Sequence, residues 1–173
     1  MPSRSSKKYA WLTFSTLYLS FPSKAALLSE VIRPAIRGDA PNARLAGSPG
    51  WKALAATPTN DVLGAFALLV EDILHDVAEL LAVGDAAATD DPALADLRDR
   101  GRDAEHSTYR TVAELLHARG ALAEPLSVEE ATDIIYAVAS PSVYLRLTRD
   151  RGWTRDAYSG WLADTLTVAL LPS

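Results

Sequence analysis

Residues 91–120 of the 173-residue chain read DPALADLRDRGRDAEHSTYRTVAELLHARG, which predicts one long helix. Asp91 can accept hydrogen bonds from the first backbone N–H groups of a helix, and Pro92 suits the first helical position because it carries no N–H. Gly120 ends the pattern, where helices often close with a left-handed residue. Between these signals the helix carries its large apolar residues: Leu94, Leu97, Tyr109, Val112, Leu115 and Leu116.

Upstream of this segment, a second helical pattern runs from about residue 60 to 88. The pattern fits either one long helix or a helix that breaks near its middle or near Gly84, because glycine is a poor helix former. Residues 43–59 are rich in glycine and proline and therefore predict a loop, with Trp51 as its one large apolar anchor.

Downstream, Ser127 and Glu130 have the spacing of a capping box and predict the start of another helix. Pro141 must kink or end that helix, because proline cannot supply the backbone hydrogen bond. Gly152 closes the segment, and a last helix is expected from about residue 155 to 171. Because no stretch alternates apolar and polar residues as a half-buried strand does, the sequence predicts an all-α helical bundle.

Composition excludes several classes of protein. Apolar residues make up 49% of the chain and charged residues 23%, which is typical of a globular domain. Cysteine is absent, so the chain has no disulfide, thiolate nucleophile or cysteine-ligated metal. No apolar run approaches the roughly 18–20 residues that span a bilayer, so we expect no membrane partner and a cytoplasmic protein.

Charge is distributed unevenly along the chain. Residues 1–37 hold six lysines and arginines and one acid, a net charge of +5, whereas residues 38–173 hold eleven bases and twenty-one acids, a net charge of −10. A basic head on an acidic body indicates contact between the head and a polyanion. The alternative interpretation is a basic terminus that is simply solvated.

The head itself predicts a short helix, a tight turn and a second helix over residues 12–28. A short helix with small polar residues at its start can dock in the major groove of DNA, and a helix N-terminus beside a lysine can hold a phosphate. The run from Lys7 to Phe21 also has a superficial likeness to a signal peptide, but Thr13, Ser15 and other polar residues interrupt its apolar region.

The pattern Thr16-x-Tyr18-x-x-Phe21-x-Ser23-Lys24, followed by Leu27 and Leu28, resembles the tetracycline-repressor (TetR) family of transcriptional regulators. The stretches 139–144, 150–153 and 161–166 resemble that family's regulatory domain. The resemblance implies a partial helix-turn-helix in residues 1–38 and a ligand-binding and dimerisation domain in residues 39–173. Within the head it implies a recognition helix at about 13–21 and a linking helix at about 23–37.

Only about twelve residues precede Thr13, fewer than the two further helices of the family's DNA-binding region require. The helix-turn-helix is therefore expected to be truncated. The resemblance implies that these residues contact double-stranded DNA: Thr13, Phe14, Ser15, Tyr18 and Lys24. It further implies a ligand-responsive regulator, usually a repressor in this family, that binds its operator as a homodimer.

The resemblance also implies that the bundle encloses a small ligand, here a mostly apolar one. Candidate lining residues are the large or amphipathic side chains of the middle helices, namely Phe66, Leu69, Leu74, His75, Tyr109, Val112, Leu116 and Tyr136. For each of these, the alternative is that it simply fills the core.

The last two helices are unusually apolar, and we expect part of their surface to form the homodimer interface. The residues concerned are Ile135, Val138, Tyr144, Tyr158, Trp161, Leu162, Leu166 and Leu170. The alternative is that they pack inside the bundle.

Two other functions compete with the regulator. One is a ligand-binding dimer of the same fold that has lost DNA binding through its truncated head. The other is an enzyme built on His75, with Glu71, Asp72 and Glu79 three or four residues away on one helix face. Because the chain has no phosphate-binding loop, nucleophile elbow or zinc-binding histidine motif, we expect no enzyme, no cofactor and no metal.

Overall fold

The computed structural model describes residues 23–37 and 49–172, and these ranges contain helices and no strand. The long elements are α2 (Lys24–Arg37), α4 (Val62–Ala87), α5 (Pro92–Ala118), α6 (Val128–Val138) and α8 (Arg155–Leu170). The shorter ones are α3 (Pro49–Ala56), the 3₁₀ turn η2 (Thr59–Asp61), α7 (Pro141–Leu145) and the π-helical turn η3 (Arg146–Asp150). The predicted all-α bundle is thereby confirmed.

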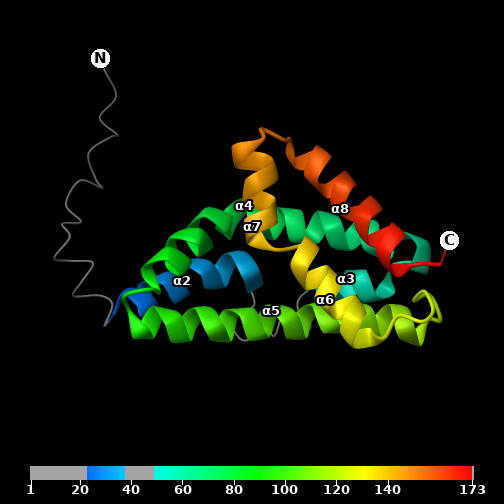
Figure 1. The fold of residues 1–173 in the computed structure, drawn as a ribbon, viewed down its shortest axis with the longest axis horizontal. Helices are drawn as coiled ribbons and strands as arrows, with labels where there is room; N and C mark the ends of the chain where they lie inside the picture. Colours follow the sequence, from blue (N-terminus) through cyan, green and yellow to red (C-terminus); the bar gives the residue numbers. More distant parts are fainter. Residues whose placement is uncertain (1–22, 38–48, 173) are drawn as a thin grey trace, which may run out of the picture.

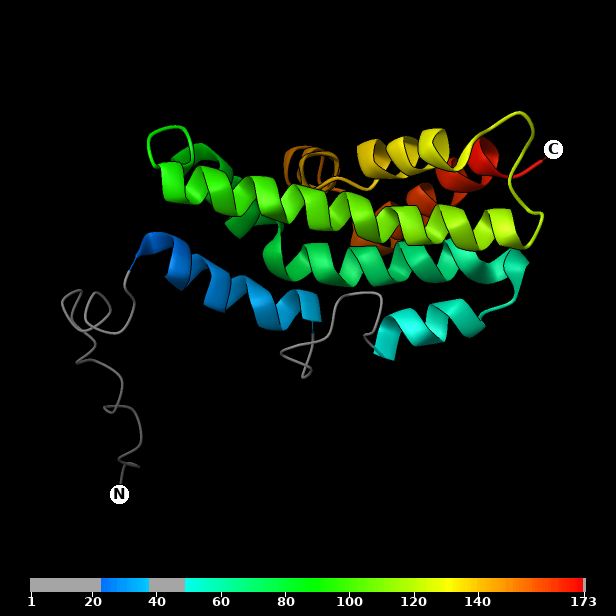
Figure 2. The ribbon, with the colours of Figure 1, turned by 90° about the horizontal axis from the view of Figure 1, so that it is seen from below.

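Helix α4 is the centre of the bundle (Figures 1 and 2). It contacts α2, α3, α5, α7 and α8, while α6 packs between α5 and α8. Its buried face contributes Val62, Leu63, Phe66 and Val70 to the core. Among the helices described, none has the length and apolar character needed to cross a membrane.

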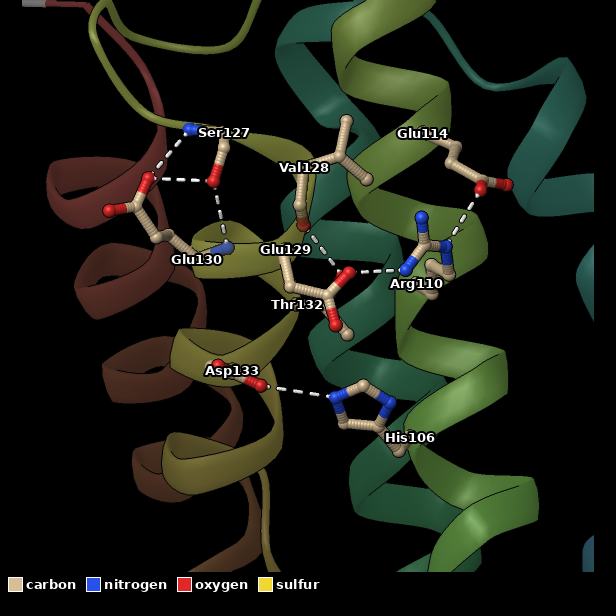
Figure 3. Close-up of polar contacts among 9 residues, drawn as sticks. All are labelled: His106, Arg110, Glu114, Ser127, Val128, Glu129, Glu130, Thr132 and Asp133. Carbon is tan, nitrogen blue, oxygen red and sulfur yellow. Dashed lines mark hydrogen bonds and ion pairs between the residues drawn. The ribbon is translucent and has the colours of Figure 1, made fainter.

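The helix ends follow the chemistry of the sequence. The Asp91 side chain accepts hydrogen bonds from the backbone N–H groups of Ala93 at 3.0 Å and Leu94 at 3.3 Å, as an N-cap does. Gly120 has a φ of 65°, the left-handed conformation expected after α5. Ser127 and Glu130 satisfy each other's backbone N–H groups, which confirms the capping box (Figure 3).

Proline divides the next helical stretch as predicted. Helix α6 ends at Val138, and α7 begins at Pro141 with the Ser140 hydroxyl as its cap. The segment closes at Gly152, whose φ of 72° is again left-handed. Helix α8 then starts beside the capping hydroxyl of Thr154.

One prediction about local structure was wrong, and one open alternative is decided. Part of residues 43–59, expected as a loop, forms α3, which buries Trp51 and Leu54. A Cβ on Gly50 would lie 3.1 Å from the Leu69 side chain, so glycine lets α3 approach α4 closely. Helix α4 also continues through Gly84 without a break. The missing side chain at Gly84 makes room for Leu28 of α2, since a Cβ there would lie 2.8 Å from a Leu28 methyl group.

Candidate ligand-binding site

Three of the predicted ligand-binding residues meet in the interior, although they come from three helices. Phe66 of α4 and Tyr109 of α5 form an edge-to-face pair with ring centroids 5.6 Å apart. Tyr136 of α6 adds a tilted ring 6.4 Å from that of Tyr109. We call these residues, together with Glu105, His106 and Tyr158, the aromatic–acid cluster.

The other predicted ligand-binding residues are placed differently. Leu74, Val112 and Leu116 are buried in the core, and Leu69 is half-buried beside α3. His75 lies on the exposed face of α4, so it does not share an interior surface with the other residues.

A carboxylic acid contacts one of these three aromatic residues. The Tyr109 hydroxyl donates a 3.0 Å hydrogen bond to Oε1 of Glu105, one turn earlier on α5, and also lies 3.5 Å from the carbonyl oxygen of Ala139. Burial raises the pKa of Glu105, and the hydrogen bond from Tyr109 opposes that rise only in part. Burial likewise raises the pKa of Tyr109 well above its usual value, because a phenolate would lose its hydration there.

The cluster extends to a tyrosine whose hydroxyl is unsatisfied. Tyr158 of α8 has no exposed surface, and its hydroxyl is a buried oxygen without a hydrogen-bond partner among the described residues. Its ring packs edge-to-face on that of Tyr144 at 4.8 Å and lies 5.9 Å from that of Trp161. Burial, with the neighbouring Tyr144, Glu71 and Glu105, raises the pKa of this phenol. Because buried polar groups are almost always paired, this hydroxyl is an exception among the buried polar side chains of the described residues.

The outer side of the cluster is held together by polar contacts between α5 and α6 (Figure 3). His106 faces Asp133 at 3.1 Å, and Arg110 bridges to Glu129 of α6 and to Glu114 of its own helix. The His106 ring also packs edge-to-face on Tyr136 at 5.6 Å. The His106–Asp133 and Arg110–Glu129 contacts cross from α5 to α6 and fix the position of α6, and with it that of Tyr136, relative to α5.

Reasoning from the sequence missed Glu105 and His106 and assigned Tyr158 to the wrong surface. A usable signal existed for Glu105, because it precedes Tyr109, Val112 and Leu116 by 4, 7 and 11 residues and so lies on the same helix face. An acid on an apolar face is unusual enough to suggest a site. Nothing in the sequence marks the Tyr158 hydroxyl, because its burial depends on how α8 packs against other helices such as α4 and α6.

A separate cavity lies at the end of the bundle, in the turn between α5 and α6. Its volume is about 260 Å³, and its lining consists of His117, Gly120, Leu122, Ala123, Glu124, Pro125 and Leu126. None of the predicted ligand-binding residues belongs to this lining. The turn is anchored by the N–H of Ala123, which donates to the carbonyl oxygen of Leu170 at 2.8 Å.

The acids expected around His75 form ion pairs with arginines from other elements of the fold. Glu71 is buried and accepts two hydrogen bonds from Arg155 at 2.6 and 2.8 Å, and Asp72 also faces Arg155. Glu79 faces Arg149. Within the described parts of the chain, no group of three histidine or acidic side chains could hold a metal ion. The acids therefore join α4 to η3 and α8 and do not converge on His75.

The residues expected at a dimer interface need correction. Ile135, Tyr158, Leu162, Leu166 and Leu170 have no exposed surface within a single chain, and Tyr144 is buried as well. Only Val138 and Trp161 are partly exposed. The expectation was wrong because the long helix α4 covers α7 and α8, so one chain has enough interior to bury these side chains.

Of the predicted DNA-binding residues, Lys24 is the first residue of α2 and is exposed. Its helix is capped by Ser23, whose hydroxyl oxygen accepts a hydrogen bond from the N–H of Ala26 at 3.1 Å. Thr13, Phe14, Ser15 and Tyr18 lie outside the described residues, as does the expected recognition helix at about 13–21, whereas α2 occupies the range expected for the linking helix. Comparisons of the chain with protein-family models, curated proteins and solved structures found no match.

Proposed function

We propose that the protein is a ligand-responsive transcriptional regulator, in which the aromatic–acid cluster binds a small, mostly apolar molecule with one polar group. The observation that carries this proposal is the buried Tyr158 hydroxyl, which has no partner among the described residues. Leaving such a hydroxyl unpaired destabilises the folded protein by about 1–3 kcal/mol. A ligand that forms a hydrogen bond with this hydroxyl would remove that penalty. The resemblance of the head to TetR-family regulators supports the regulatory role.

The arrangement of the helices supplies a path from ligand to head. Helix α2, the linking helix of the head, rests on both α4 and α5 (Figure 2). Leu28 of α2 fits against Gly84 near the end of α4, while the cluster lies between α4, α5, α6 and α8. A ligand that separates these helices changes the surface on which α2 rests, and so biases the head between two positions.

Two features of the proposal concern DNA. The basic head supplies the charge for phosphate contacts, with Lys24 at the N-terminus of α2 placed to hold one of them. The proposal also includes a homodimer, because two-fold symmetric operators are read by two-fold symmetric dimers. We place its interface on the outer side of α8, where Val168 is 85% exposed and Trp161 is partly exposed.

The test is binding of the full chain to a labelled duplex from its own upstream region, over a salt series and against an unrelated duplex. We expect Lys24→Ala to weaken binding to every sequence and to lower the salt slope by about one. Lys52→Ala, which removes an exposed lysine of α3, is the matched control and should leave binding unchanged.

Weak binding that ignores sequence, together with equal effects of the two lysine variants, would contradict the regulator. That result would instead favour the ligand-binding dimer without DNA affinity. For the dimer, sedimentation of Val168→Glu should show monomers where the unmodified chain shows dimers.

A further inference from the structure

The aromatic–acid cluster has an unusual combination of groups. A carboxyl group, Glu105, lies within hydrogen-bond distance of the Tyr109 hydroxyl, and the Tyr109 ring neighbours those of Phe66 and Tyr136. Aromatic faces carry partial negative charge, as a carboxylate carries full negative charge. Both kinds of group therefore favour a positively charged ligand.

The charge of Arg102 lowers the pKa of Glu105 to some extent, but the basic side chains around Glu105 are paired with other acids. Arg102, one turn earlier on α5, faces Asp85 of α4 at 3.0 Å, and His106 faces Asp133 of α6 at 3.1 Å. Asp103 adds another acid near Tyr136. Each basic side chain beside Glu105 thus already has a carboxylate partner, and the cluster keeps an excess of negative charge. An anionic ligand would be repelled here, whereas a cation would be attracted.

We propose that the ligand of the aromatic–acid cluster is an organic cation, an amine or quaternary ammonium with an apolar body, whose charge faces Glu105 and whose body packs on Tyr109, Tyr136 and Phe66. The inference rests on the proposed ligand site and names the class of molecule that the site takes.

The exposure of the cluster provides a route for such a molecule. Glu105, His106 and Tyr136 are partly exposed, whereas Phe66, Tyr109 and Tyr158 are buried behind them. The charged end of a ligand would stay near the half-buried Glu105 carboxylate. Its apolar end would pack among the rings of Phe66, Tyr109 and Tyr136 and separate rings that now touch each other. A hydrogen-bond acceptor or donor on that apolar end would satisfy the Tyr158 hydroxyl.

The test compares two probes of nearly the same shape, phenyltrimethylammonium and tert-butylbenzene, which differ in charge. Calorimetric titration of the full chain should show the cation binding about 10-fold or more tightly than the neutral probe. Benzenesulfonate, the probe of opposite charge, should not bind. Glu105→Gln keeps the shape and an acceptor for the Tyr109 hydroxyl, and it should abolish the preference for the cation.

Glu114→Gln is the matched control, because it makes the same change on an exposed residue of the same helix. It should leave both affinities unchanged. Thermal unfolding of each variant shows that the fold is retained.

Equal affinity for the cation and the neutral probe, unaffected by Glu105→Gln, would overturn the inference while leaving a ligand site in place. Failure of both probes to bind would also overturn it. In either case the DNA titration decides the proposed function independently.

Discussion

The Tyr109 hydroxyl donates its hydrogen bond to Glu105 across one turn of α5, over a donor–acceptor distance of 3.0 Å. This pair places a titratable acid beside the core of a helical bundle, next to Tyr109, whose ring neighbours those of Phe66 on α4 and Tyr136 on α6. Natural cores rarely carry such a group unless it is paired or used. The Tyr109 hydroxyl has a hydrogen-bond partner in this pair, whereas the Tyr158 hydroxyl has none among the described residues.

Tyr158→Phe should therefore stabilise the ligand-free protein. The substitution removes a buried hydroxyl without a described partner and leaves the ring in place, so the free energy of unfolding should rise by about 1 kcal/mol. Tyr109→Phe is the contrasting control, because its hydroxyl is bonded, and it should lower stability by about 1 kcal/mol. Urea unfolding measures both. A loss of stability in Tyr158→Phe would show that the hydroxyl already has a partner.

The pH dependence of stability should reveal Glu105. Burial raises its pKa in the folded chain above the ordinary glutamate value, so the folded state binds the proton more tightly than the unfolded state. Its contribution to stability is therefore complete below the unfolded pKa and is lost as pH rises through the folded pKa. Glu105→Gln should remove this fall in stability between those two values. A variant with the same pH profile as the unmodified chain would contradict the assignment.

The contribution of Glu130 to stability should change with pH in the opposite direction to that of Glu105. Hydrogen bonds from the Ser127 hydroxyl and backbone N–H lower its pKa in the folded state. Its contribution is present above the unfolded pKa and disappears as pH falls through the folded pKa.

Ser127→Ala should cost about 1 kcal/mol near neutral pH by removing the cap of α6, as thermal or urea unfolding can measure. No change in stability would mean that α6 does not depend on its capping box.

Gly84→Ala should loosen α2 without unfolding the bundle. The new Cβ would lie 2.8 Å from a Leu28 methyl group, so the Leu28 side chain must move. Hydrogen exchange should become faster in α2 and remain slow in the core of α4 and α5. Gly101→Ala on α5 is the control, because a Cβ there meets nothing within 4 Å, and it should stabilise the protein by about 1 kcal/mol. Unchanged exchange in α2 would show that α2 does not depend on this contact.

Local signals in the sequence predicted much of the fold. Asp91, Pro141 and the capping box of Ser127 act within one helical turn, so their effect is visible in the sequence alone. The sequence suggested that Gly50 belongs to a loop and that Gly84 is one of the points where a long helix could break. Each of them instead makes room for a side chain from another helix, Leu69 or Leu28, and such a fit depends on tertiary packing.

The candidate site was predicted only in part. Phe66, Tyr109 and Tyr136 are amphipathic or large residues on the middle helices, between which the resemblance to the TetR family implies a ligand. Periodicity could not show that Tyr158 faces the same interior, because the same apolar pattern fits a core or a dimer interface. The position of α4 against α8 decides between them, and that position is a property of the whole bundle.

The most direct test of the ligand site is ¹⁹F NMR of the full chain labelled with 3-fluorotyrosine. The chain has six tyrosines, so each resonance can be assigned with a single Tyr→Phe variant. Titration with phenyltrimethylammonium should shift the resonances of Tyr109, Tyr136 and Tyr158 saturably and together, with a weaker response from tert-butylbenzene. If those three resonances stay unchanged with both probes, the aromatic–acid cluster is packed core and the account of the ligand site is wrong.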